Sequence, residues 1–490
     1  MGYIEKIQSM LQNGEISCVE LTEKYLKAIE EANGELNAYV TVTPEVALEQ
    51  AKQVDEKIKR GEKLLPLEGV PMTLKDNIST NGIETTCCSK ILKGYKPIYD
   101  AKVWEVLKKN NAILLGKTNM DEFAMGSSCE TSCFGGATNP FNTDHVAGGS
   151  SGGVASAVGG DIAAFGLGSD TGGSIRQPAS FCGIVGLKPT YGAVSRYGLV
   201  AYASSLDQIG PITKTVEDAS LVYDVISEYD ENDSTCEGRQ GEPTYDTLNN
   251  DIKGMKIGIA REYLEGVRED VKEAVLEAAK KYEEMGAEIV YFDLPALKFA
   301  LPVYYILACA EASSNLGRYD GIRYGYKTEH YEGIHDMICK TRSEGFGEEV
   351  KRRILLGTYV LSAGYYDAYY LKALRVKALI KKAFDEAFAK YDVILGPVAP
   401  TTALKMGESL SDPIKMYLGD IYTVSVNLAG LPGISLPCGQ DKDGMPVGMQ
   451  LLGQTFDEKS IIRAAYAFEC TKTYKRPDAL GTVEAERGLA

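Results

Sequence analysis

The chain has 490 residues, of which 44% are hydrophobic and 24% charged, and its formal net charge at pH 7 is −16. This composition is typical of a soluble globular protein with enough apolar residues for a large core. The acidic excess argues against a chain that grips a nucleic-acid backbone by itself, because clustered Lys and Arg side chains do that work.

The chain shows no sign of a membrane or secretory protein. No uninterrupted apolar segment is long enough to span a bilayer, and the first six residues, MGYIEK, lack the basic and then apolar order of a signal peptide. The eleven cysteines are scattered and odd in number, and pairs such as Cys129 and Cys133 lack the spacing of a zinc site. We therefore expect a cytoplasmic protein with reduced thiols and no metal site.

The first 64 residues predict an N-terminal helical layer. Ser17 and Glu20 have the spacing of a capping box ahead of LTEKYLKAIEEA. Thr43 followed by Pro44 starts a second helix, which runs to Gly61.

An α/β pattern follows. Residues 67–75 and 112–115 predict strands on either side of a helix at 101–110, as in a βαβ unit with a mixed or parallel sheet. The sequence Gly116-Lys117-Thr118 suggests a phosphate-binding loop, but Asn111 stands where the first glycine of that motif belongs. ATP binding by this chain is therefore not expected.

The second half repeats the alternation. Residues 212–229 predict a helix, and the polar stretch 230–250 predicts a surface excursion. The further expected elements are strands at 255–260, 287–292, 393–398, 433–438 and 447–452, and helices at 269–285, 347–391 with a break near Gly364, and 457–473. We expect one large α/β domain over residues 1–490, with 1–64 as its helical layer.

The stretch at residues 147–183 carries the strongest functional signal. It frames two serines with glycines, Ser150 in GGSSGG and Ser174 in DTGGS, around an apolar segment of small residues. Glycines leave backbone N–H groups uncovered, and such groups can hold a developing oxyanion. An isolated GGS is usually a flexible turn, but these glycines flank apolar segments, unlike those of a linker.

A serine nucleophile needs a base, and the chain has three histidines. Lys75 is an alternative, since it ends an apolar strand, LEGVPMTLK, beside Asp76 and Asn77. Burial disfavours the charged form of a lysine, lowers its pKa and lets the neutral amine accept a proton. By its pattern alone, such a lysine is more often a surface charge at the end of a strand.

Lys75 and the two serine motifs resemble the amidase signature family. The resemblance extends over nearly the whole chain and is weakest at residues 230–250 and at the C-terminus. It is strongest for members that act as the glutamine-hydrolysing subunit of tRNA-dependent amidotransferases, and it is carried by NMDEFAMGSS (119–128), GLKPTYGAVSRYG (186–198), LDQIGP (206–211), EASSNLGRYD (311–320) and VNLAGLPG (426–433). The fold implied is an amidase signature fold, a central mixed sheet surrounded by helices.

The resemblance also implies roles for individual residues. Ser174 is the nucleophile, and Ser150, on a cis peptide bond, relays its proton to Lys75. The oxyanion hole is assigned to the backbone of Thr171, Gly172 and Gly173. Glutamine, a zwitterion, requires a cation and an anion, and these roles fall on Arg353 and Asp420, with Tyr305 as a neighbour. The sequence does not separate Tyr304 from Tyr305, or Arg352 from Arg353.

The activity implied is glutamine hydrolysis that supplies ammonia to a partner for ATP-dependent conversion of Glu-tRNA(Gln) to Gln-tRNA(Gln). The partners are the B and C subunits of a heterotrimeric amidotransferase, and the misacylated tRNA is reached through them. This chain needs no cofactor, whereas the partner protein uses ATP and Mg. The sequence does not tell whether the complex prefers Glu-tRNA(Gln) or Asp-tRNA(Asn).

Three alternatives remain. A stand-alone amidase of the same family would keep the triad but act on another amide. A scaffold protein of the complex would carry a relict site, against which the intact Lys75, Ser150 and Ser174 argue. Residues 148–152, GGSSG, also match the G-x-S-x-G nucleophile elbow of α/β-hydrolases, with His330 or His335 as base. The elbow interpretation leaves Lys75 and the Ser174 glycines unexplained.

Overall fold

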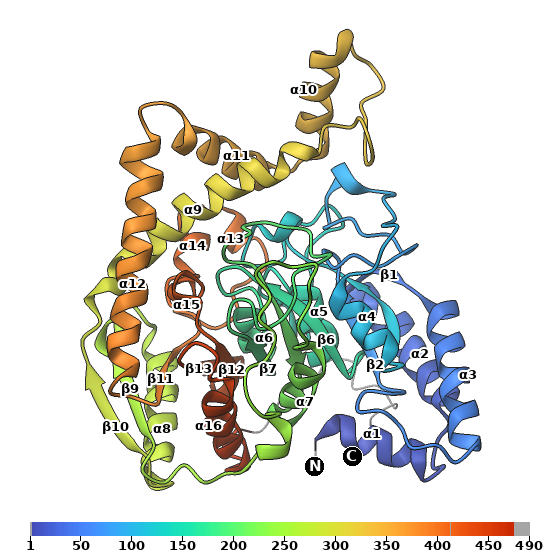
Figure 1. Ribbon diagram of the computed structural model, residues 1–490, viewed down its shortest axis with the longest axis vertical. Helices are drawn as coiled ribbons and strands as arrows, with labels where there is room; N and C mark the ends of the chain where they lie inside the picture. Colours follow the sequence, from blue (N-terminus) through green and yellow to red (C-terminus); the bar gives the residue numbers. More distant parts are fainter. Residues whose placement is uncertain (1, 412, 475–490) are drawn as a thin grey trace.

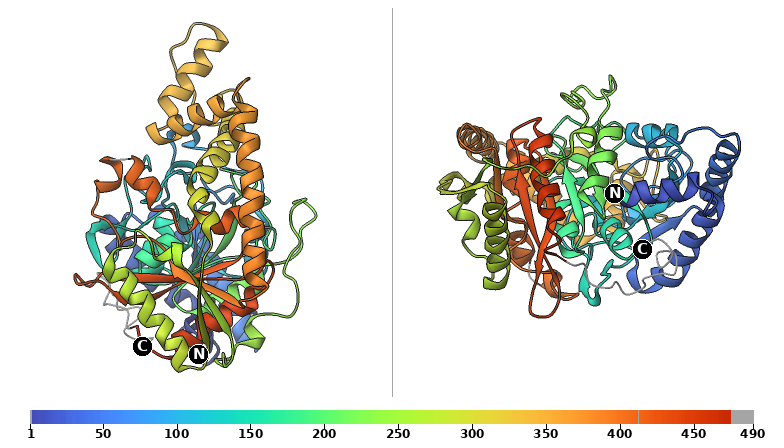
Figure 2. Two further views of the ribbon diagram at one scale, coloured as in Figure 1. Left: turned by 90° about the vertical axis from the view of Figure 1, so that its left-hand side faces the viewer. Right: turned by 90° about the horizontal axis from the view of Figure 1, so that it is seen from below.

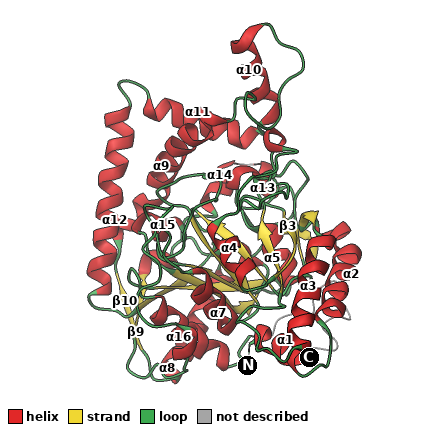
Figure 3. Ribbon diagram, turned by 45° about the vertical axis from the view of Figure 1, so that its right-hand side comes forward, coloured by secondary structure: helices red, strands yellow, loops and turns green. Residues whose placement is uncertain are grey.

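A mixed 11-stranded sheet forms the centre of the computed structural model, which describes residues 2–411 and 413–474. Helices surround the sheet (Figure 3), so the expected α/β class is confirmed. Its strands in spatial order are β1 (Tyr39–Val42), β3 (Ile113–Thr118), β2 (Pro71–Lys75), β6 (Phe165–Asp170), β8 (Gln208–Thr213), β7 (Val185–Lys188), β12 (Gly433–Gln440), β13 (Pro446–Leu452), β11 (Val393–Pro397), β9 (Lys256–Ala260) and β10 (Glu288–Phe292). A separate pair is formed by β4 (Thr138–Asn139) and β5 (Asn142–Val146).

The helices pack in layers on this sheet. One layer joins α7, α8 and α16, and another joins α5 and α6 on the central strands. The α-helices are α1 (Tyr3–Gln12), α2 (Cys18–Leu36), α3 (Pro44–Lys59), α4 (Lys102–Lys109), α5 (Gly152–Gly159), α6 (Arg176–Phe181), α7 (Val216–Ile226), α8 (Glu269–Glu284), α9 (Ala300–Asn315), α10 (Gly333–Gly345), α11 (Glu348–Leu361), α12 (Lys372–Phe388), α13 (Glu408–Ser411), α14 (Pro413–Leu418), α15 (Val424–Ala429) and α16 (Glu458–Cys470).

The register of the central strands places the chemistry at one edge of the sheet. Strand β2 runs parallel to β3 and β6, with Leu74 opposite Leu167, and every residue of the three strands is buried. Because parallel strands bring their carboxyl ends to the same edge, Lys75 at the end of β2 lies beside Ser169 and Asp170 at the end of β6.

The N-terminal layer forms as the sequence predicts, with one addition. The Ser17 hydroxyl accepts from the Glu20 N–H, and the Glu20 carboxylate accepts from the Ser17 N–H, which confirms the capping box. The expectation of an all-helical 1–64 is wrong at β1, which pairs antiparallel with β3. Asn37 ends α2 in the left-handed conformation, and the following Tyr-Val-Thr-Val favours a strand.

A second correction concerns residues 212–229, which were expected to be one helix. Residues 208–213 instead form β8, where Pro211 lies opposite Leu167 of β6. The helix α7 begins after Thr215, whose hydroxyl accepts from the Asp218 N–H. The N-cap, rather than the apolar run before it, therefore decides where this helix starts.

The expected long helix near residues 347–391 has its break where glycine allows it. Helix α11 ends at Leu361, Gly364 has a φ of +85°, and a π-helical turn, η7 (Tyr366–Leu371), leads into α12. Figure 1 shows α11 and α12 (orange) meeting at this corner, with α10 projecting from the other end of α11.

One helical stretch of the described chain, Pro295–Arg318, is long and apolar enough to cross a membrane by length and composition. No segment of this kind was expected from the sequence. Half of its most apolar window is buried inside the protein, and α9 packs against α11, α12 and α15. Packing within the protein therefore accounts for the buried half of this helix.

Candidate active site

Lys75 is completely buried at the end of β2, and its amine lies among serine oxygens. Its Nζ is 2.7 Å from Ser150 Oγ, 3.0 Å from Ser169 Oγ and 3.2 Å from the Ser169 carbonyl oxygen. Burial lowers the pKa of Lys75 to about 8, despite the nearby carboxylates of Asp121 and Asp170. Lys75 is thus a buried lysine poised to lose a proton, and not the surface charge that its sequence pattern also allowed.

The hydrogens and the lone pair of the neutral Lys75 amine limit which hydrogen bonds it can form. A neutral amine has two hydrogens and one lone pair, and the Ser169 carbonyl can only accept. The Asn77 amide donates to Ser169 Oγ at 3.0 Å and so fixes that hydroxyl. When both amine hydrogens are donated to the two oxygens of Ser169, the lone pair faces the Ser150 hydroxyl.

Ser150 lies in the loop between β5 and α5, and its peptide bond with Gly149 is cis. The Gly149 N–H donates to Gln177 Oε1 at 3.2 Å, and the Ser150 carbonyl accepts from the Asp121 N–H at 3.3 Å. A side chain at Gly149 would overlap the Asp121 carboxylate and the backbone of Ser128. Glycine is required there because the surrounding backbone approaches so closely.

Ser174 follows the loop at the end of β6 and retains 8% of its exposure. Its carbonyl accepts from the Ser151 N–H at 3.1 Å, which ties the two serine loops together. Within the described residues the Ser174 hydroxyl has no hydrogen bond, not even to Ser150. The structure brings the three expected triad residues into one region, with the Lys75–Ser150 contact formed and the Ser150–Ser174 contact not formed.

The glycines before Ser174 are required by packing. A Cβ at Gly172 would collide with the Tyr304 ring, and one at Gly173, where φ is +134°, would collide with Thr423. The Gly173 N–H donates to Asp170 Oδ1 at 2.8 Å, contrary to the free donor expected there. The N–H groups of Thr171, Gly172 and Ser174 have no partner among the described residues and are free donors of this loop.

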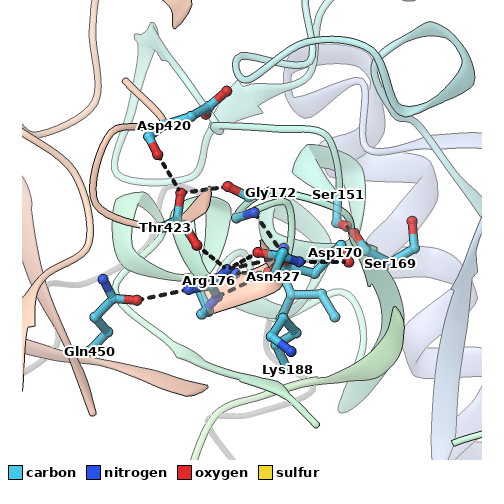
Figure 4. Close-up of polar contacts among 12 residues, drawn as sticks. Ser151, Ser169, Asp170, Gly172, Arg176, Lys188, Asp420, Thr423, Asn427 and Gln450 are labelled. Atoms are coloured by element: carbon cyan, nitrogen blue, oxygen red, sulfur yellow. Dashed lines mark hydrogen bonds and ion pairs between the residues drawn. The ribbon is translucent and has the colours of Figure 1, made fainter. Parts of the chain in front are cut away.

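A buried network holds the Ser174 loop in place (Figure 4). The Asp170 carboxylate accepts from Arg176 Nε at 3.1 Å and from Asn427 Nδ2 at 2.9 Å. Arg176 also donates to Gln450 Oε1 at 2.9 Å. Burial alone would raise the pKa of Asp170, but the Arg176 guanidinium holds that pKa well below its usual range. The buried ion pair between Asp170 and Arg176 thus holds the two ends of the Ser174 loop together.

The three expected substrate residues form a second cluster. Tyr305 donates its hydroxyl to Asp420 Oδ2 at 2.8 Å, and the Arg353 guanidinium lies 5.3 Å from the centre of the Tyr305 ring. Burial raises the pKa of Asp420 to about 7. The cluster reaches the serine loop through Thr423, whose hydroxyl donates to the Gly172 carbonyl at 2.5 Å.

The structure separates the residue pairs that the sequence left open. Arg353 is 3% exposed and donates to Glu349 Oε1 and to the Tyr202 hydroxyl, both at 2.7 Å, whereas the Arg352 side chain is 43% exposed. Tyr305 binds Asp420, while Tyr304 packs on Gly172. Arg353 and Tyr305 therefore belong to the cluster, and Tyr304 lies at the nucleophile loop.

A cavity of about 320 Å³ opens beside this region. Its lining includes Ser127, Gln177, Gly419 and Tyr422. Gln177 contacts the Gly149 N–H, and Gly419 precedes Asp420. The cavity is thus lined by residues next to the serine loops and next to Asp420.

Sequence reasoning missed the residues that support the site. Ser169 and Asn77 hold the amine, Asp170 and Thr423 hold the loop, and Glu349 holds Arg353. Asp170 lies in the DTGGS motif and Asn77 lies two residues after Lys75, so the sequence placed both near the site. It did not indicate which residues they contact. Ser169 carried no signal beyond its place at the end of an apolar strand.

The histidines lie away from the serines in the described structure. His145 Nδ1 contacts the Ala403 carbonyl at 2.8 Å, and His335 lies on the projecting helix α10 near Cys339. The left view of Figure 2 shows this helix standing clear of the sheet. The nucleophile-elbow interpretation with His330 or His335 as base therefore has no support in this geometry.

A family model described as Amidase matches residues 20–462. The chain belongs to the amidase family. It is 61% identical over 465 residues to the A subunit of glutamyl-tRNA(Gln) amidotransferase from Lachnospira eligens, covering 95% of this chain and 97% of that protein.

Solved structures agree with this membership. The crystal structure of the A subunit of glutamyl-tRNA(Gln) amidotransferase from Thermotoga maritima superposes with a TM-score of 0.78 at 40% identity, with 95% of each chain covered. A peptide amidase from Stenotrophomonas maltophilia superposes with a TM-score of 0.83 at 28% identity, covering 97% of this chain and 98% of that one. The enzyme class and the amidase signature fold expected from the sequence are therefore confirmed.

Proposed function

We propose that this chain is the glutaminase subunit of a tRNA-dependent amidotransferase. The observation that carries the proposal is the buried Lys75 amine, 2.7 Å from Ser150 Oγ and next to the loop of Ser174. The similarity to relatives named as the A subunit of glutamyl-tRNA(Gln) amidotransferase supports the choice of glutamine among amides.

The substrate cluster has the charges that free glutamine requires. Within the described residues, Arg353 has hydrogen bonds on Nε and one terminal nitrogen, which leaves Nη2 for the glutamine carboxylate. Asp420 and the Tyr305 hydroxyl would receive the ammonium group. A bound cation favours the ionised carboxylate and would lower the pKa of Asp420 again. The side-chain amide would then extend towards Ser174.

The chemical step follows from these positions. Ser174 Oγ attacks the amide carbonyl carbon, its proton passes to Ser150, and Ser150 gives its own proton to Lys75. The Ser174 hydroxyl must first rotate towards Ser150. The N–H groups of Thr171 and Gly172 stabilise the oxyanion, and Gly173 contributes only when its bond to Asp170 loosens.

Collapse of the tetrahedral intermediate breaks the C–N bond. The proton returns from Lys75 through Ser150 to the leaving nitrogen, which departs as ammonia. Water then attacks the acyl-enzyme by the same proton route, releases glutamate and restores Ser174. The chain itself needs no metal or cofactor for this cycle.

The ammonia would serve the B and C subunits of the complex, which would bind ATP, Mg and the misacylated tRNA in the cytoplasm. The runner-up function is a stand-alone amidase, since the peptide amidase shares this fold at 28% identity. An amidase for peptides or aryl amides has no use for a buried cation and anion placed to bind a zwitterion.

Hydrolysis assays distinguish the two functions. We expect the purified protein, with its partners, to hydrolyse glutamine and to lose at least about 1,000-fold in kcat in Ser174→Ala. Glutamine analogues that lack either the amino or the carboxylate group should be poor substrates. Hydrolysis of neutral amides at the rate of glutamine would favour the stand-alone amidase.

A further inference from the structure

Helices α9 and α12 leave an apolar groove between them, which we call the α9–α12 groove. It encloses about 630 Å³ and is lined by Phe299, Val303, Ile306, Val376, Leu379 and neighbouring residues. Phe299 is 48% exposed and Leu379 is 61% exposed. The two helices run side by side in both Figure 1 and the left view of Figure 2.

The apolar surface continues from this groove onto α11. Tyr369 lines the groove, and its ring lies 6.0 Å from Tyr365 and 6.2 Å from Tyr359. One turn earlier on α11, Leu355 is 70% exposed and Leu356 is 45% exposed. A continuous apolar surface of this kind is unusual on a protein that works alone and marks a binding surface.

The rim of the groove is basic although the chain is strongly acidic. On α12, residues 372–382 contain five Lys or Arg residues and no acidic residue, and two of the five, Lys381 and Lys382, pair with Asp385 and Glu386; the whole chain carries a net charge of −16. Lys372 and Arg375 are exposed on α12, and Lys298 lies 4.9 Å from the Phe299 ring centre. These three cations make no ion pair within the described residues, so they are available to a partner.

We propose that the α9–α12 groove binds an acidic amphipathic helix of a partner protein in the amidotransferase. This inference rests on the proposed function, because a glutaminase that supplies ammonia to other chains must have such partners. An apolar floor between helices fits the apolar face of a helix, and the unpaired cations fit acidic residues on its flanks. Nucleic acid is less suitable, because exposed Leu and Phe side chains offer nothing to a phosphate backbone.

The position of the groove also couples it to the active site. On α9 the groove residues Val303 and Ile306 lie on one face, and Tyr304 and Tyr305 lie on the opposite face, against the site. A helix bound in the groove would therefore press on the element that positions Tyr305 and Asp420.

Photo-cross-linking in the assembled complex tests the proposal. Leu379 is replaced by p-benzoylphenylalanine in the full chain, which is produced with the B and C subunits of its own host. Tyr291 on β10, which is 45% exposed, is replaced in a matched control. We expect irradiation to join position 379, and not position 291, to an acidic amphipathic segment of one of these partners.

A charge-reversal pair adds a measurement of affinity. Lys372→Glu with Arg375→Glu should weaken assembly at least about tenfold, whereas Lys280→Glu with Lys281→Glu on α8 should leave it unchanged. Unaltered melting temperatures of the isolated chains would show that both variants fold.

Other results overturn the inference. Cross-links from position 379 to tRNA, to lipid or to a second copy of this chain would identify a different occupant. An intact complex with no cross-link at 379, or with equal affinity in both charge variants, would leave the proposed function standing and this location wrong. Failure of the unsubstituted chain to assemble would contradict both.

Discussion

In the proposed mechanism Lys75 is the base, and only its neutral form accepts a proton. Burial lowers the pKa of Lys75 to about 8, so the neutral fraction grows as the pH rises through that value. We expect kcat/KM for glutamine to increase with pH up to about 8 and then to level off. Lys75→Arg should be as inactive as Lys75→Ala, since arginine keeps the charge but does not deprotonate. An active arginine variant would show that only the positive charge matters, and a pH-independent rate would show that Lys75 does not act as the base.

Ser169 is expected to act through Lys75. Its two oxygens take the amine hydrogens at 3.0 and 3.2 Å, and in Ser169→Ala the side-chain acceptor is lost. We expect kcat to fall about 10- to 100-fold, the value of one hydrogen bond to a charged group, with KM nearly unchanged. The pH profile should shift as well, and Ser169→Thr should restore part of the rate. An unchanged pH profile would assign Ser169 a structural role only.

The neighbouring arginines provide a matched comparison. Arg353→Ala should raise KM for glutamine about 10- to 100-fold, because the carboxylate loses its buried cation. Arg352→Ala, one residue away and 43% exposed, should change KM less than about twofold. Steady-state kinetics of both variants measure the difference, and equal effects would contradict the assignment.

At the scale of elements, the N-terminal end of α11 depends on one buried carboxylate. Glu122 accepts from the Gly347 N–H at 2.9 Å and from the Ser89 hydroxyl, and burial raises the pKa of Glu122 to about 7. Because α11 carries Arg353 and Glu349, this contact links β3 and the following loop to the substrate cluster.

Glu122→Ala should therefore lower both stability and affinity. We expect the free energy of unfolding to fall by about 1–3 kcal/mol, since buried donors lose their acceptor, and KM for glutamine to rise. Glu348→Ala, at an exposed position in the same turn, should change stability by less than about 0.5 kcal/mol. Urea unfolding measures the free energy of unfolding, and steady-state kinetics measure KM. If Glu122→Ala is destabilised but keeps the wild-type KM, then the position of α11 does not affect substrate binding.

Most helices and strands could be predicted from the sequence, because the hydrophobic periodicity and the helix-capping residues indicated the same elements. The capping box at Ser17 and the break at Gly364 lie where expected, since each depends on local chemistry. The strand β1 was missed because its four residues are stabilised by pairing with β3, which local patterns do not show. The start of α7 was misplaced because an apolar run does not by itself distinguish strand β8 from helix.

The candidate site also has residues that the sequence indicates and contacts that it does not. Lys75, Ser150 and Ser174 were visible in motifs, but the choice of Arg353 over Arg352 depends on which face of α11 packs against α9. The engagement of the Gly173 N–H by Asp170 depends on a turn that brings residues 170 and 173 together. These contacts come from tertiary packing, which spacing along the chain does not encode.

In the proposed function, the whole protein carries out one half of a reaction. Lys117 is buried 3.4 Å from Asp76, so the Gly116-Lys117-Thr118 turn presents no exposed cation to a phosphate. Under the proposed function, ammonia made at Ser174 would be used by a partner that activates the glutamate of the misacylated tRNA.

Rescue by ammonium tests this division of labour most directly. In the complete complex, Ser174→Ala should lose glutamine-dependent amidation of Glu-tRNA(Gln) but recover amidation when ammonium is added, because only the source of ammonia has been removed. The measurement is the yield of Gln-tRNA(Gln) with each nitrogen donor. A folded Ser174→Ala complex that ammonium does not rescue, or one that still uses glutamine, would contradict the account.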